Sequence, residues 1–257
     1  MLNGKLFIHI PKNGGMSIRH GQSKFRERMG PQGLIWPRAP IMKKGYHEPF
    51  EAKMRHLGRP NVPYEHARWR DLTRDVQFAY DAFAIVRNPW SRVVSRYTFA
   101  VRNNNDWDSV TIKGKKTGGR NMTFDEFLDQ RHQWTDNAGG CGDATFSWHL
   151  AIRGWWNAFD YVCDDKGYLR CKMMRFENYE QDVNQFFGYP KDEPIFIRNV
   201  SQGDKAEDGL SIAGRKDYRE YYNSEQMQIV ADWYKKDIDF FGFDFDTAAT
   251  KNIWAKV

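Results

Sequence analysis

The chain has 257 residues, of which 40% are hydrophobic and 28% are charged, so its composition is that of a folded globular protein and excludes a largely disordered chain. A chain of this length can bury one substantial core, and we expect a single domain over residues 1–257. The formal net charge of +6 favours anionic ligands by long-range attraction.

The sequence contains no feature typical of a membrane, disulfide-rich or metal-binding protein. No apolar run reaches the roughly 18 residues of a membrane-spanning helix, and the start lacks the pattern of a signal peptide. Cys141, Cys163 and Cys171 lack paired C-x-x-C spacing. We therefore expect a soluble, cytoplasmic protein with no membrane partner, no disulfide framework and no bound metal.

The first predicted unit is a strand followed by a glycine-rich turn and a helix. Residues 2–10 have the apolar density of a buried strand, which Pro11 ends because it has no N–H group. Gly30 is placed to end the helix that follows. Ile18, Gln22, Phe25 and Met29 share one face of this helix.

Residues 31–63 are interrupted by proline and glycine and predict irregular structure. A second buried strand is predicted over residues 78–86, and Pro89 suits the first turn of a helix over residues 89–99. Residues 102–122 have no periodicity and predict a mobile surface loop.

The second half continues with alternating elements. Thr123 and Glu126 form a capping-box pattern that predicts a helix to about His132. Two strands around a tight turn are expected at residues 159–163 and 168–174. A helix over residues 177–187 before Gly188, a strand-like segment at 195–200 and an amphipathic helix behind Asn223 or Ser224 complete the chain.

Strands that alternate with helices predict an α/β fold, with a mainly parallel sheet covered on both faces. In such sheets ligands bind beyond the carboxyl ends of the strands. The loops at residues 11–17 and 87–95 are both predicted to lie at that edge.

The first loop has the features of an oxyanion site. Gly14 and Gly15 allow consecutive backbone N–H groups to face a ligand, Lys12 adds a positive charge and Ser17 adds a hydroxyl. In the Walker A pattern the lysine follows the glycines, whereas Lys12 precedes them. An ordinary ATP-binding loop is therefore disfavoured.

The second loop predicts another oxyanion site. Arg87 leaves the end of the second strand, and Ser95 follows on the helix that Pro89 opens. Two such sites at one edge of a sheet fit a ligand that carries phosphates at both ends.

The two loop segments together resemble those of a known family. The segments HIPKNGGMS at 9–17 and VRNPWSRVVSRY at 86–97 are similar to the paired nucleotide motifs of sulfotransferases that use 3′-phosphoadenosine 5′-phosphosulfate (PAPS), with the closest resemblance to the carbohydrate branch of heparan and chondroitin type. RFENY at 175–179 and the segment 221–243 are similar to later family segments. The resemblance implies a P-loop-like three-layer fold.

The resemblance also implies roles for individual residues. Lys12 would contact the 5′-phosphosulfate and Arg87 and Ser95 would hold the 3′-phosphate. The N–H groups of the loop would cradle the phosphosulfate; they belong to Asn13, Gly14, Gly15, Met16 and Ser17. Met16 stands where the family usually has a hydroxyl residue, a difference for which Ser17 partly compensates.

The acceptor hydroxyl has to lose a proton, and histidine is the natural base for this task. His66 precedes the Arg87 strand by a spacing similar to that of the base in related enzymes, and His9 and Glu65 are alternatives. The implied acceptor is a carbohydrate or another small polar molecule. Additional candidates are Trp134, Trp148, Trp155 and Trp156 for stacking on sugar rings, and Lys205, Arg215 and Lys216 for the nucleotide.

Two other functions remain open at the level of the sequence. A P-loop-type nucleotide kinase would prefer ATP with Mg²⁺, although the order of Lys12 and the glycines disfavours it. A non-catalytic protein that binds nucleic acid or acidic glycan would use the positive charge and exposed aromatic residues. Our main hypothesis has no nucleic-acid partner.

Overall fold

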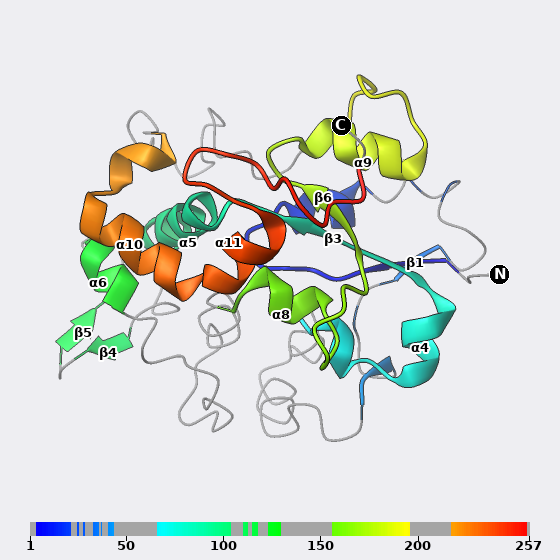
Figure 1. Cartoon of the computed structure of the whole chain (residues 1–257), viewed down its shortest axis with the longest axis horizontal. Coiled ribbons are helices and arrows are strands. Elements are labelled where there is room, and N and C mark those ends of the chain that lie inside the picture. Colours follow the sequence, from blue (N-terminus) through cyan, green and yellow to red (C-terminus); the bar gives the residue numbers. More distant parts are fainter. Residues whose placement is uncertain are drawn as a thin grey trace.

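A parallel sheet forms the centre of the fold in the computed structural model (Figure 1). The structure describes residues 4–21, 25, 28, 33–35, 37, 41–43, 66–103, 110–112, 115–117, 123–129, 156–195 and 217–255. The sheet has the strand order β2-β1-β3-β6, and every neighbouring pair is parallel. The strands are β1 (Lys5–Phe7), β2 (Leu34–Ile35), β3 (Asp81–Val86) and β6 (Lys172–Arg175).

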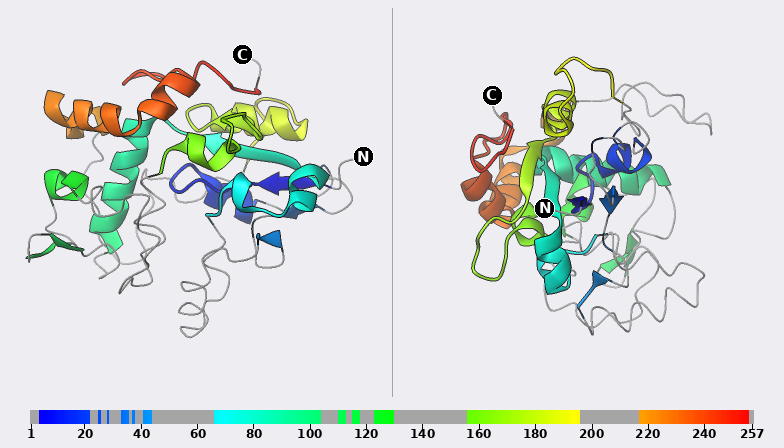
Figure 2. Two further views of the ribbon diagram at one scale, coloured as in Figure 1. Left: turned by 60° about the horizontal axis from the view of Figure 1, so that its bottom comes forward. Right: turned by 90° about the vertical axis from the view of Figure 1, so that its right-hand side faces the viewer.

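Helices cover both faces of the sheet because successive strand residues point to opposite sides. Ala84 and Met173 face one apolar cluster with α5 (Pro89–Asn103), α6 (Phe124–Asp129), α8 (Ala158–Val162), α10 (Ser224–Trp233) and α11 (Lys235–Phe241). Phe83 and Met174 face a second cluster with α1 (Gly15–His20) and α9 (Tyr179–Phe187). Figure 2 shows α10 and α11 on one side of the strands and α1 on the other, which confirms the predicted three-layer α/β fold.

The two strands that precede the predicted loops are shorter than expected. Residues 8–10 follow β1 without belonging to it, although the Ile8 N–H still donates to the Phe83 carbonyl at 2.9 Å. Phe78 and Ala79, predicted to open the second strand, instead end helix α4 (Arg74–Ala79). The chain crosses from α4 into β3 at Tyr80, which has an extended backbone.

Local capping signals correctly located several helix ends. Pro89 opens α5, Gly188 ends α9 with a left-handed φ of 72°, and the Asn223 side chain accepts from the Gln226 N–H at 2.8 Å to begin α10. The Thr123 N–H donates to Glu126 at 2.8 Å, so the predicted capping box is formed. Two 3-10 helices, η4 (Trp69–Asp71) and η7 (Tyr218–Tyr221), complete the described helices.

Two predicted boundaries were wrong. Helix α1 ends at His20 instead of near Gly30, because Gly21 already closes it with an N–H bond to the Ser17 carbonyl at 2.9 Å. The predicted loop over residues 102–122 contains an antiparallel pair, β4 (Val110–Ile112) and β5 (Lys115–Thr117). Short strands of this kind have too few residues for a periodic pattern to stand out in the sequence.

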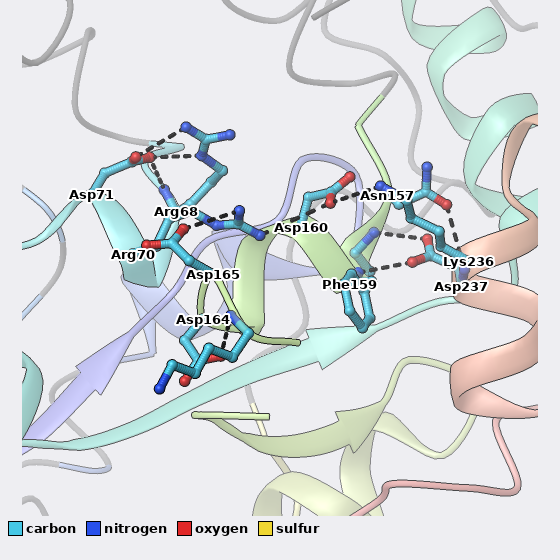
Figure 3. A network of polar contacts seen from close by, with 12 residues as sticks. Arg68, Arg70, Asp71, Asn157, Phe159, Asp160, Asp164, Asp165, Lys236 and Asp237 are labelled. Carbon is cyan, nitrogen blue, oxygen red and sulfur yellow. Dashed lines mark hydrogen bonds and ion pairs between the residues drawn. The ribbon is translucent and has the colours of Figure 1, made fainter. Parts of the chain in front are cut away.

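The strand predicted at residues 159–163 is the helix α8. Asp237 of α11 determines this outcome, since its carboxylate accepts from the Ala158 and Phe159 N–H groups at 2.7 and 2.8 Å and so satisfies the first turn (Figure 3). The tight turn that follows is present, with an isolated antiparallel bridge between Cys163 and Leu169. A distant acceptor has thus overridden a strand-like local sequence.

Several predictions lie outside the described residues. They are most of the strand-like segment 195–200, the stacking candidates Trp134, Trp148 and Trp155, the basic residues Lys205, Arg215 and Lys216, and Glu65. Within the described part of the chain, no helix has both the length and the apolar character that crossing a membrane requires.

We expect Asp237→Asn to remove a pH-dependent part of the stability. Burial raises the pKa of Asp237 from 3.8 to about 6, so its protonation favours the folded state. Its stabilising contribution is complete below about pH 4 and is lost as the pH rises through about 6. The difference in unfolding free energy between wild type and variant should therefore change by about 2–3 kcal/mol between about pH 4 and pH 7.

Urea unfolding of both proteins at several pH values measures this difference. The variant also loses one of the two hydrogen bonds from the N–H groups, which changes its unfolding free energy by the same amount at every pH. Only the change of the free-energy difference with pH therefore tests the prediction. A difference that stays constant across the pH range would contradict it.

Candidate functional site

The two loops identified in the sequence meet in the structure. Strands β1 and β3 are parallel neighbours, so the loops that follow them emerge at the same edge of the sheet. Arg87 joins the loops directly: its Nη1 donates to the Lys12 carbonyl at 3.1 Å, while its Nε donates to Ser91 Oγ at 2.9 Å. The predicted juxtaposition of residues 11–17 and 87–95 is confirmed.

Side chains from other segments hold the backbone carbonyls at the start of the first loop. His66 Nδ1 lies 2.8 Å from the His9 carbonyl oxygen, and Arg92 Nε donates to the Pro11 carbonyl at 3.2 Å. With the Arg87 contact to Lys12, three carbonyls within residues 9–12 have a side-chain donor. Lys12 itself has a φ of 66°, a left-handed conformation that is uncommon for a residue with a side chain.

Gly14 and Gly15 have neighbouring rings so close that a side chain at either position would collide with them. Gly14 has a φ of 80°, and a Cβ at this position would lie 3.0 Å from the Tyr179 ring and 3.1 Å from the Phe176 ring. A Cβ on Gly15 would lie 2.1 Å from Cδ2 of His9. Aromatic rings therefore pack against the loop at both glycines, and the loop keeps this shape only without side chains there.

The hydroxyl of Ser17 is engaged within the protein. Ser17 is buried, its N–H donates to the Gly14 carbonyl at 3.1 Å, and its side chain is hydrogen-bonded to Tyr179. Burial raises the pKa of Tyr179, which keeps this phenol protonated. An oxyanion would have to compete with Tyr179 for the Ser17 hydroxyl, which the sequence did not show.

Arg87 is charged and well oriented. Its guanidinium lies over the Phe176 ring at 4.1 Å, and burial lowers its pKa to about 10, an effect that the nearby Glu177 opposes. The group therefore stays protonated at neutral pH. Ser95 is half-buried and lies one turn beyond Ser91 on α5, so these two hydroxyls share the helix face that Arg87 contacts.

Asn88 is a residue of the site that the sequence reasoning missed. Its Oδ1 accepts from the Trp90 and Ser91 N–H groups at 3.1 and 3.2 Å, which caps α5, and its own N–H donates to Glu177 at 2.8 Å. Its Nδ2 also donates to three carbonyls near the end of the chain, those of Asp244, Phe245 and Thr247. The Asn-Pro dipeptide at a helix start was the signal that could have identified this cap.

The structure places the predicted base beside the first loop. The rings of His66 and His9 are 4.4 Å apart, and the side chains are only 3% and 5% exposed. Because a carbonyl oxygen only accepts hydrogen bonds, the contact with His9 puts the proton of a neutral His66 on Nδ1. Nε2 is then the nitrogen that can accept a proton, while the His9 ring packs against Gly15.

Comparison with known protein families identifies a match to the Sulfotransferase family over residues 6–244. The matched range contains both loops, His66, Asn88 and Arg92. No curated protein and no solved structure matches the chain significantly. The part of the chain that matches the family therefore includes the candidate site.

We expect Gly15→Ala to destabilise the fold by about 1–3 kcal/mol, because its Cβ would overlap the His9 ring. Removing the ring should relieve the overlap, so in the double variant with His9→Ala the alanine at position 15 should cost much less. Denaturant unfolding of the four proteins in this double-mutant cycle measures the coupling. Additive effects would show that the His9 ring does not restrict this position.

Proposed function

This chain belongs to the sulfotransferase family, whose members take the sulfuryl group from PAPS, and we propose that it transfers this group to a hydroxyl of a carbohydrate or another small polar acceptor. The single observation that carries the site assignment is the contact between Arg87 and Lys12, because it brings the two oxyanion loops together at one edge of the sheet. We further propose that one domain over residues 1–257 performs the reaction.

The cations and N–H groups of the two loops fit a nucleotide with an anionic group at each end. Lys12 and Arg87 are cations that lie half-buried at the carboxyl edge of the sheet. The first turn of α1 adds the N–H groups of Gly15 and Met16, whereas the Ser17 N–H already donates to the Gly14 carbonyl at 3.1 Å. We assign the 5′-phosphosulfate to Lys12 and the amides of Asn13, Gly14, Gly15, Met16 and Ser17, and the 3′-phosphate to Arg87 and Ser95.

The reaction requires the protein to stabilise the charge on the departing phosphate and to accept the proton of the acceptor hydroxyl. PAPS supplies a sulfuryl group on a good leaving group: the sulfur–oxygen bond to the acceptor forms while the bond to the phosphate oxygen breaks. Lys12 offsets the charge that develops on the departing phosphate, an effect worth roughly 3 kcal/mol for one well-placed donor. The acceptor proton passes to Nε2 of His66, and the released product is 3′-phosphoadenosine 5′-phosphate.

His66 is supported as the base by its position and its tautomer. The hydrogen bond to the His9 carbonyl orients the ring and leaves the lone pair on Nε2, as required of a general base. His9 is the weaker candidate, since its ring packs against the Gly15 backbone and stacks on Phe7 at 5.5 Å. Of the tryptophans considered for the acceptor, Trp156 is described, and its ring lies 4.8 Å from the Arg68 guanidinium.

We expect 3′-phosphoadenosine 5′-phosphate to raise the melting temperature strongly. At 100 times its dissociation constant a ligand adds about 2.7 kcal/mol, or roughly 5–10 °C for a chain of this size. AMP, which lacks the 3′-phosphate, should give a much smaller shift at the same concentration. A shift with ATP and Mg²⁺ alone would contradict the assignment of the two loops.

We expect His66→Asn to lower turnover by about 10²–10⁴-fold and to leave nucleotide binding nearly unchanged. The asparagine amide can still donate to the His9 carbonyl, so the variant removes the base and keeps the contact that supports the loop. Transfer from radiolabelled PAPS to desulfated glycosaminoglycan oligosaccharides measures turnover, and calorimetry with 3′-phosphoadenosine 5′-phosphate measures binding. Unchanged turnover would remove His66 from the mechanism, and no transfer by the wild type would contradict the carbohydrate acceptor.

A further inference from the structure

Arg92 is a charged side chain in an unusual place. It is the fourth residue of α5, is 1% exposed, and is among the largest side chains that the fold buries completely. Among the described residues no carboxylate lies within ion-pair distance of Arg92, although Asp237 interacts with it electrostatically from further away, and its Nη2 has no hydrogen-bond partner. Burial of an arginine without an ion pair costs free energy, so its other contacts have to account for its presence.

Those contacts are two backbone carbonyls. Nε donates to the Pro11 carbonyl at 3.2 Å, and Nη1 donates to the Trp156 carbonyl at 2.8 Å. The guanidinium also lies 5.6 Å from the centre of the Tyr234 ring. Arg92 is therefore anchored at Trp156 and Tyr234 on one side and holds the first loop on the other.

The Pro11 carbonyl belongs to the peptide group immediately before the Cα of Lys12, and the Lys12 carbonyl belongs to the one immediately after it. Arg92 holds the first of these planes and Arg87 holds the second. The orientations of the two planes are the φ and ψ angles of Lys12. Lys12 has a φ of 66°, a conformation that persists in a residue with a side chain only where its surroundings enforce it.

We propose that Arg92 is a positioning residue: by holding the Pro11–Lys12 peptide group it keeps Lys12 in the left-handed conformation that directs its ammonium toward the 5′ end of the nucleotide. This inference rests on the proposed contact between Lys12 and the 5′-phosphosulfate. Arg92 itself does not touch the nucleotide. Without it, Lys12 relaxes to an ordinary backbone conformation and its ammonium is displaced.

The test is a double-mutant cycle on nucleotide binding, which needs no acceptor. Dissociation constants are measured for the wild type, Arg92→Lys, Lys12→Ala and the double variant, with 3′-phosphoadenosine 5′-phosphate and with adenosine 3′-monophosphate. The second nucleotide lacks the phosphate that Lys12 is proposed to contact. Lysine keeps the charge of Arg92 but has no planar fork to hold two carbonyls at once.

We expect Arg92→Lys to weaken binding of 3′-phosphoadenosine 5′-phosphate by about ten- to a hundred-fold, the loss that a misplacement of about 1 Å can cause. Binding of adenosine 3′-monophosphate should not change. In the Lys12→Ala background, Arg92→Lys should have no further effect, because the group that it positions is gone.

Arg96 supplies a matched control. It lies one turn further along the same helix, is 5% exposed, and its guanidinium lies 5.8 Å from the centre of the Phe127 ring. Within the described part of the chain it makes no hydrogen bond to residues 9–13. Arg96→Lys should therefore leave both dissociation constants unchanged, even if it lowers the melting temperature.

The outcomes distinguish the positioning role of Arg92 from the proposed role of Lys12. Equal losses for both nucleotides, or additive losses in the double variant, overturn the positioning role of Arg92 and leave the proposed function intact. Unchanged binding of 3′-phosphoadenosine 5′-phosphate in Lys12→Ala overturns the proposed role of Lys12 itself. If Arg92→Lys does not fold, Arg92→Gln, which keeps an N–H donor without the charge, is measured in the same cycle with the same two criteria.

Discussion

The shape of the first loop depends on side chains that hold its backbone carbonyls. His66, Arg92 and Arg87 donate to the carbonyls of His9, Pro11 and Lys12, and these donors come from three separate positions in the chain. In the opposite direction, the side chain of Asn13 in the loop donates to the Ile85 carbonyl of β3 at 2.8 Å. A short stretch of backbone is thereby fixed by tertiary contacts and not by a regular hydrogen-bond ladder.

This arrangement requires the parallel pairing of β1 and β3. The pairing brings Arg87 to the end of its strand beside Lys12, and the Asn88 cap then directs α5 so that Arg92 points back under the loop. The charges are placed at a cost, since burial lowers the pKa of Arg87 and leaves Arg92 without an ion pair among the described residues. The ligand that we propose for this site, with an anionic group at each end, would offset that cost on binding.

Sequence reasoning succeeded where a residue acts on its near neighbours. Pro89, Gly188 and the Thr123 capping box marked helix ends correctly because their effects are local. It failed at residues 159–163, where aromatic and β-branched residues suggested a strand. The first turn of α8 is stabilised instead by Asp237, which lies 79 residues beyond Ala158.

The sequence by itself determined the α/β class, the position of the two loops at one edge of the sheet and the resemblance that the family match then supported. These follow from residue type and spacing, which are properties of short segments. Only the tertiary structure decided which carbonyls Arg87 and Arg92 hold, which nitrogen of His66 contacts the His9 carbonyl, and that Ser17 is engaged by Tyr179. Each of these is a contact between residues far apart in the chain, and spacing within one segment carries no information about such a partner.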